Sequence, residues 1–135
     1  MIKELIKLTS ENKKYINDQV LSHLSNENCL LDVTILEIKI YEREFKKVVS
    51  FKIQMRPKSL YEVIAIEFDD VREYSFCSEI GYSNYVESYK LIKLSNGLYY
   101  ISLDPFNEQQ EANDKDQDIV LSSSVSMDVL VESKA

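Results

Sequence analysis

Residues 91–104, LIKLSNGLYYISLD, decide the fold class of this chain. Two apolar-rich runs flank Asn96-Gly97, and Asn-Gly between such runs is the strongest short-range indication of a β-hairpin. With a two-residue turn at this dipeptide, Leu94 would face Tyr99 across the two strands. In that register Tyr99 points toward the core, whereas Tyr100 lies on the more exposed face.

Alternating apolar residues predict further strands along most of the chain. Between residues 49 and 55 every second side chain is apolar, which is typical of an antiparallel strand with one buried and one wet face. The same alternation runs through residues 64–68 and returns at residues 125–131. Other apolar runs predict a short strand near Tyr74 and Phe76, and strands at residues 86–94 and 98–103.

The apolar pattern changes phase once within a predicted strand. Leu31, Val33 and Ile35 alternate with polar residues, and the alternation then continues one position out of phase from Leu36. A β-bulge inserts one extra residue into a strand and changes the phase in this way. We therefore expect a bend at Ile35–Leu36, followed by a turn at residues 42–44.

A helix is predicted before the strands, at about residues 10–25. Ser10 can cap this segment, and Ile16, Val20 and Leu24 lie on one stripe of it. Strands do not alternate with helices afterwards, so a doubly wound parallel sheet is not expected. The predicted fold is α+β and mainly β: an antiparallel meander of about seven strands, barrel-like or a sandwich, with an N-terminal helix. We expect a single domain, residues 1–135, with a β region at about 29–132.

Negative charge is concentrated in the last quarter of the chain. The net charge is −7, and residues 104–135 contribute eight acidic against two basic side chains, which is −6. Residues 1–103 contribute 14 basic against 15 acidic side chains, which is −1. Because nucleic-acid backbones and anionic membranes repel an acidic surface, neither partner is expected. The densest part is an acidic loop, residues 104–118.

The cellular location is inferred from the N-terminus and from the cysteines. The first residues, MIKELIKLTSENKK, carry charges every few positions, which is unlike a secretory signal. The chain has only two cysteines, Cys29 and Cys77, and such sparse usage is typical of a reducing compartment. We therefore expect a cytoplasmic protein.

Catalytic motifs are scarce. His23 is the one histidine, and no strained turn places a nucleophile beside it. Two glycines, Gly81 and Gly97, are too few to form a phosphate-binding loop. Asp69-Asp70 and Glu73 follow a strand, where acidic residues are common in turns. We predict that the protein is not an enzyme and that it needs no cofactor.

The acidic loop partly matches a calcium-binding motif, because it carries three aspartates at alternate positions: Asp114, Asp116 and Asp118. Counted from the first of them, an EF-hand loop would need Gly where Ile119 stands and Glu where Val125 stands. The motif therefore fails, and a solvated connector is the favoured interpretation. A weak Ca²⁺ site that also uses Asp104 is kept as an alternative.

Tyrosines gather around the predicted hairpin. Tyrosine has an apolar ring and a polar tip, and it is enriched at protein interfaces. Beside acidic residues, it can contribute contact area while the carboxylates attract a basic partner. The candidate partner-binding residues are Tyr82, Tyr85, Tyr89, Tyr100, Asp104 and Glu108.

The segment YKLIKLSNGLYYISLDPFNE, followed by DQDIVLSSSVSMDVL, resembles a pattern in small bacterial proteins. The resemblance covers about residues 64–131 and consists of a tyrosine-rich hairpin, Ser-Leu-Asp-Pro, an acidic loop and Asp-x-Asp before a last strand. Such proteins are similar to the immunity proteins encoded beside polymorphic or contact-dependent toxins. The resemblance implies a cytoplasmic, acidic, non-catalytic single domain.

Two functions of different classes follow. The first is a non-catalytic protein-binding domain, such as a toxin-neutralising immunity protein, whose acidic and tyrosine-bearing surface binds a basic protein. The second is a small-ligand or Ca²⁺-binding β domain that uses the acidic loop.

Overall fold

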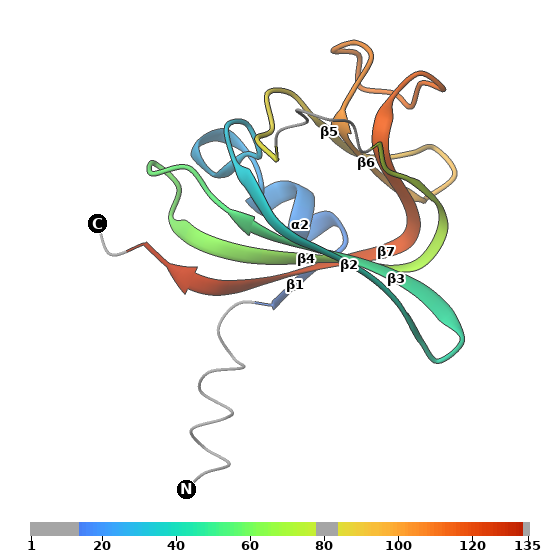
Figure 1. Cartoon of the computed structure of the whole chain (residues 1–135), viewed down its shortest axis with the longest axis horizontal. Helices are drawn as coiled ribbons and strands as arrows, with labels where there is room; N and C mark the ends of the chain where they lie inside the picture. The colour runs from blue at the N-terminus through green and yellow to red at the C-terminus, as the bar shows by residue number, and fades with distance from the viewer. Residues whose placement is uncertain (1–13, 78–83, 134–135) are drawn as a thin grey trace, which may run out of the picture.

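The computed structural model describes residues 14–77 and 84–133. Among these residues, seven antiparallel strands form one open, strongly curved sheet, and one short α-helix packs against it (Figure 1). The fold is therefore mainly β, as predicted. The elements are β1 (Lys14–Ile16), α2 (Asp18–His23), a 3₁₀ turn (Asn26–Asn28), β2 (Thr34–Arg43), β3 (Lys46–Gln54), β4 (Tyr61–Ser75), β5 (Lys90–Lys93), β6 (Tyr99–Asp104) and β7 (Gln117–Glu132).

The long strand β7 joins the two halves of the sheet. The strand order is β2-β3-β4-β7-β6-β5, and β1 pairs with β7 outside this order. One side of β7 pairs with β4 along most of its length. Its other side pairs with β6 near its start and with β1 further along. At the β2 end of the sheet, residues 84–86 extend the curve with backbone hydrogen bonds to residues 32–35.

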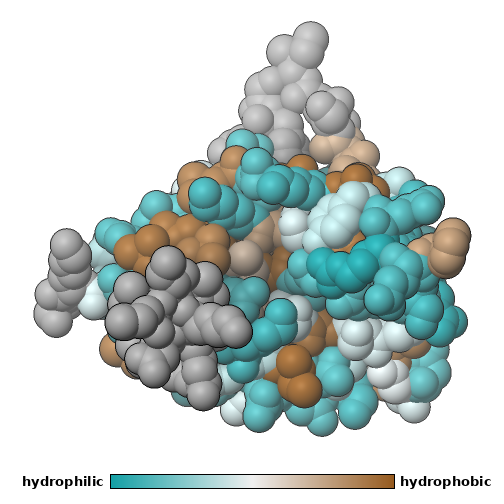
Figure 2. All heavy atoms as spheres, turned by 90° about the horizontal axis from the view of Figure 1, so that it is seen from below, coloured by the Kyte–Doolittle hydropathy of each residue, from teal (hydrophilic) through white to brown (hydrophobic). Residues whose placement is uncertain are grey.

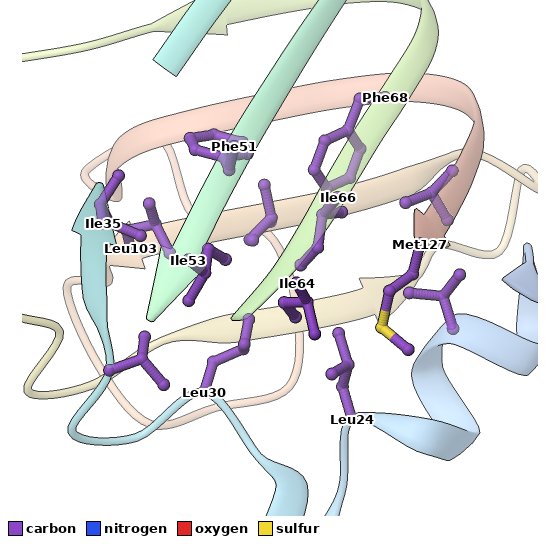
Figure 3. Packing of buried hydrophobic residues seen from close by; sticks show 14 of the residues in the cluster. Leu24, Leu30, Ile35, Phe51, Ile53, Ile64, Ile66, Phe68, Leu103 and Met127 are labelled. Carbon is purple, nitrogen blue, oxygen red and sulfur yellow. The ribbon is translucent and has the colours of Figure 1, made fainter. Parts of the chain in front are cut away.

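The core lies on the concave face of the sheet. Neighbouring strands place Phe51 opposite Ile66, and Ile66 opposite Met127, so that one row of apolar side chains crosses the middle of the sheet. Phe68 meets the Phe51 ring edge-on, with centroids 5.9 Å apart. Leu24, which follows α2, and Leu30 cover this row from the other side (Figure 3).

The N-terminal helix is present but much shorter than predicted. Residues 10–13 lie outside the described residues, and residues 14–16 form β1 instead of helix. Asn17 separates the two elements, because its φ is 52° and its backbone N–H donates to the Val125 carbonyl at 2.7 Å. The Asn17 side-chain oxygen accepts the Val125 N–H at 3.1 Å, so this pair of bonds fixes the chain to β7 before α2 begins.

The central hairpin forms, but the predicted register is wrong by one residue. Its loop has three residues, 95–97, closed by a bond from the Leu94 N–H to the Leu98 carbonyl at 2.8 Å. Gly97 has a φ of +88°, as expected for a three-residue loop that ends in a left-handed position. Consequently Lys93, not Leu94, faces Tyr99. Both Tyr99 and Tyr100 are buried, which also corrects the expected exposure of Tyr100.

Of three further predictions about strands, one is confirmed, one is wrong, and one strand is shorter than predicted. The predicted β-bulge is confirmed, because the β2–β3 register shifts between Ile35 and Glu37. The predicted separate strand near Tyr74 is wrong, because β4 continues to Ser75 through an irregularity near Asp70, whose φ is 51°. The predicted strand at residues 86–94 shortens to β5.

The turn after β2 lies two residues later than predicted. β2 continues to Arg43, and Glu44 and Phe45 form the turn with φ values of 53° and 68°. Two consecutive positive φ values match a type I′ turn, which favours Asn-Gly. The Phe45 side chain is 99% exposed and therefore gains nothing from the core. The turn is strained, and Figure 1 shows its hairpin projecting beyond the rest of the sheet.

Introducing a glycine at position 45 and removing the glycine at position 97 should therefore change stability in opposite directions. Phe45→Gly removes the steric strain of a side chain at positive φ and should raise the free energy of unfolding by about 0.5–1 kcal/mol. Gly97→Ala meets no atom within 4 Å but imposes a side chain at positive φ, so it should lower that energy by about 1 kcal/mol. Urea unfolding monitored by circular dichroism measures both, and a loss of stability in Phe45→Gly would contradict the assignment of strain.

Candidate functional site

A buried ion pair organises the acidic loop. Lys90 extends from β5, and its ammonium lies 3.1 Å from both carboxylate oxygens of Asp116. Both side chains are fully buried, and the ammonium also donates to the Glu111 carbonyl at 2.9 Å. The loop therefore folds back over β5 and β6 instead of extending into solvent.

The Asp116 carboxylate is the centre of this network. It accepts the Tyr100 hydroxyl at 2.7 Å, the Phe106 N–H at 2.8 Å and the Asn113 N–H at 3.0 Å, besides the two contacts from Lys90. These donors come from both strands of the hairpin and from two points of the loop. A buried carboxylate is tolerated when its oxygens are satisfied in this way.

The network changes the proton affinities of its members. Burial raises the pKa of Asp116, but the hydrogen bonds from Tyr100, Phe106, Lys90 and Asn113 outweigh it, so the pKa lies below its ordinary value of 3.8. Burial, and then the hydrogen bond to the Asp116 carboxylate, raises the pKa of Tyr100. Tyr100 therefore remains a hydrogen-bond donor throughout the physiological range.

The three alternating aspartates have three different environments. Asp114 is exposed, and Asp116 is held by Lys90. Asp118 is buried and accepts the Cys77 N–H at 2.8 Å. In the part of the chain that the structure describes, no three His, Cys, Asp or Glu side chains are grouped so that they could hold a metal ion. The arrangement therefore does not favour the calcium alternative.

A surface hollow brings two predicted partner-binding residues together. Tyr89 and Glu108 line an open hollow of about 280 Å³ between the acidic loop and the start of β5. Leu31, Leu91 and Pro105 give it apolar walls, and its remaining lining residues are polar: Ser88, Asn107 and Gln110. The result is a partly apolar depression with a carboxylate at its rim.

Two further acidic residues are chain neighbours of the residues that line this hollow: Asp104 precedes Pro105, and Glu87 precedes Ser88. Burial, and then the negative charges of Asp118 and Glu87, raises the pKa of Asp104 above its ordinary value. Like charges raise a carboxyl pKa when they lie close enough to repel each other. The exposed side chains of Asp104, Glu87 and Glu108 therefore create a negative field at this end of the molecule.

The other predicted partner-binding residues lie elsewhere. Tyr100 is buried with its hydroxyl on Asp116. Tyr85 is exposed and donates its hydroxyl to Asp32 at 2.6 Å. Tyr82 lies outside the described residues. The hollow also contains Leu31 and Leu91, which sequence reasoning had placed in strands without assigning them to a site.

The remaining candidates for chemistry have structural contacts. The His23 ring stacks on Tyr15 with centroids 3.7 Å apart, and its Nδ1 lies 3.1 Å from the Tyr61 hydroxyl. Asp70 accepts hydrogen bonds from Arg72 and Ser123. These residues therefore connect neighbouring elements of the fold.

Comparisons with known proteins give no further guidance: no family model, no curated protein and no solved structure matches the chain. None of the helices in the described residues has the length and apolar character that a membrane crossing requires.

Removing either member of the buried pair should destabilise the protein, with unequal cost. Asp116→Ala leaves the Lys90 ammonium buried without its counter-charge and also frees two backbone N–H groups, so it should cost about 3–5 kcal/mol. Lys90→Met leaves a carboxylate that still accepts three hydrogen bonds, so it should cost less. Urea midpoints rank the two variants, and equal stability of wild type and Asp116→Ala would contradict the role of this pair.

Acid should weaken the same network. Because the pKa of Asp116 is lower in the folded than in the unfolded chain, its contribution to stability is complete above 3.8 and is lost as the pH falls below that value. Urea unfolding between about pH 6 and pH 2 measures this loss. The Asp116→Ala variant should show a smaller decrease over the same interval, and an identical decrease would show that other carboxylates account for it.

Proposed function

We propose that this protein is a non-catalytic protein-binding domain that holds a basic partner at the hollow lined by Tyr89 and Glu108. The observation that carries the proposal is the lining of this hollow, which combines apolar walls with a tyrosine and the Glu108 carboxylate. The exposed residues Asp104 and Glu87 adjoin its lining residues Pro105 and Ser88 in the chain. The apolar walls suit the aliphatic stem of an arginine or lysine side chain, and the carboxylate suits its charged head.

The fit is chemical on both counts. Arginine and lysine bury their aliphatic stems against apolar surface while the charged head stays near water or a counter-charge. In the hollow, Leu31, Leu91 and the Tyr89 ring can receive the stem, and Glu108 can receive the charge. The hollow of about 280 Å³ is of a size for one or two such side chains rather than a folded segment.

The surrounding charge supports the same choice of partner. Burial first, and then the negative charges of Asp118 and Glu87, raise the pKa of Asp104, and a positive group bound beside Asp104 would offset the charge part of this effect. The field of these carboxylates also accelerates encounter with a basic protein and slows encounter with an acidic one. The resemblance to immunity proteins gives the partner a class: a basic toxin encoded by a neighbouring gene.

The ordered conformation of the acidic loop favours a role in binding over that of a solvated connector. The loop is fixed through Asp116, so Glu108 and Pro105 stand at defined positions before any partner arrives. A preorganised surface loses less conformational entropy on binding than a mobile one. The network thus serves the hollow without touching the partner.

Binding to the product of the neighbouring gene tests the proposal. Titration calorimetry at low and moderate salt should show a complex whose affinity falls with ionic strength. Glu108→Lys should weaken it by about tenfold or more, because the substitution reverses the charge at the rim of the hollow. Glu62→Lys changes the same charge at an exposed position on β4 and serves as the matched control.

Co-expression gives a second readout. If the partner is a toxin, wild type and Glu62→Lys should restore growth to cells that produce it, and Glu108→Lys should restore it less well. Absence of a complex with that product, or equal affinity of Glu108→Lys and Glu62→Lys, would refute the proposal.

A further inference from the structure

A second surface, separate from the hollow, lies along the edge strand β2. In the part of the chain that the structure describes, β3 pairs with one side of β2, and residues 84–86 pair with the other side only as far as Ile35. Among the described residues, therefore, no strand lies beside the outer edge of residues 36–43. Such an edge presents a row of backbone donors and acceptors that can pair with another chain.

The side chains along this edge are unusually apolar for an open strand. Ile38 and Ile40 lie opposite Phe51 and Val49, on the core face of the sheet, yet each is 42% exposed. They extend the core beyond the part that the rest of the molecule covers. Figure 2 shows hydrophobic residues at several separate places on one face of the surface, among mostly hydrophilic ones.

We propose that β2 pairs antiparallel with β2 of a second copy of this chain, with Ile40 on the twofold axis. The pairing closes the open edge of both copies at once, since a twofold contact uses the same surface on each. It joins the two sheets into one continuous sheet across the dimer.

Directly opposed residues share a face of the sheet, so in a twofold pair of identical strands one residue must lie opposite its own copy. The twofold axis passes between these two copies. An axis at Lys39 opposes two lysines, and an axis at Tyr41 opposes Lys39 and Arg43. An axis at Ile38 pairs only residues 36–40 and puts the bulge at Leu36 into the ladder. Each of these three registers therefore carries a repulsion or a defect.

The axis at Ile40 pairs the whole stretch 37–43 without a like-charge opposition. Glu37 of each copy then faces Arg43 of the other, and Lys39 faces Tyr41. Opposite charges directly across two strands stabilise the pair, and a cation over a tyrosine ring adds to it. Within its own chain Arg43 donates to Glu67 of β4 at 2.7 Å and to the Tyr41 hydroxyl at 2.9 Å, so the contact with Glu37 of the other copy requires the guanidinium to turn toward the outer edge. The Glu37 carboxylate, now 3.6 Å from Lys39 on the same strand, lies within reach of this edge.

The same register also determines where the ladder between the two copies ends. Position 45 of one copy would fall opposite position 35 of the other, but the Ile35 N–H already donates to the Asn84 carbonyl at 2.9 Å, so the ladder between the copies ends at residues 37 and 43. A contact between two strands over residues 37–43 alone buries little surface by the standard of protein interfaces, so the dimer is expected to be weak.

Sedimentation velocity from low micromolar to about 1 mM chain tests the dimer. Wild type should pass from monomer to dimer over this range, and Glu37→Lys, which opposes Arg43 with a like charge, should shift the midpoint at least about tenfold upward. The control Glu62→Lys should not shift it.

Cysteine cross-linking tests the register. Ile40→Cys should give a disulfide-linked dimer under mild oxidation, Lys39→Cys should give much less, and wild type gives the background from Cys29 and Cys77. A protein that stays monomeric at the highest concentration would overturn the proposal. So would faster cross-linking through Lys39→Cys than through Ile40→Cys. Because Glu108→Lys does not touch β2, it should leave dimerisation unchanged, which separates this surface from the hollow.

Discussion

The buried contact between Lys90 and Asp116 is the constraint on which the acidic end of the molecule depends. It takes two charges out of water, which is costly unless every oxygen and proton finds a partner. Here Tyr100 and two backbone N–H groups complete the set. A segment with the composition of a solvated linker is thereby held against β5 and β6, and the hollow beside it acquires a fixed outline.

Periodicity predicted most of the fold because each strand has one buried and one exposed face. Alternation at residues 49–55 and 64–68 identified β3 and the centre of β4, and the phase change at Leu36 identified the bulge. The hairpin register failed because Asn-Gly fits both two- and three-residue loops, and only the position of Gly97 at φ +88° decides between them. The helix was overestimated because Tyr15 and Ile16 fit a helical stripe and a strand equally well.

The site was harder to predict, since it depends on contacts distant in sequence. Alternating aspartates indicate ligands that point the same way, but Asp116 and Asp118 belong to different networks once the loop folds back. No local pattern showed that Lys90 is buried, because lysine in a short strand is ordinarily exposed. Tyr89 and Glu108 were found by composition, whereas Leu31 joins them only through the curvature of the sheet.

The central place of β7 has a consequence for how the protein forms during translation. Strands β2 to β4 make one antiparallel group and β5 with β6 another, and the two are joined by β7, which follows both groups in the sequence. The N-terminal part of the chain leaves the ribosome first, so both groups of strands emerge with one edge unpaired until residues 117–132 follow. The sheet is therefore completed only after residues 117–132 have left the exit tunnel, and ribosome-bound intermediates expose apolar strand edges that chaperones recognise.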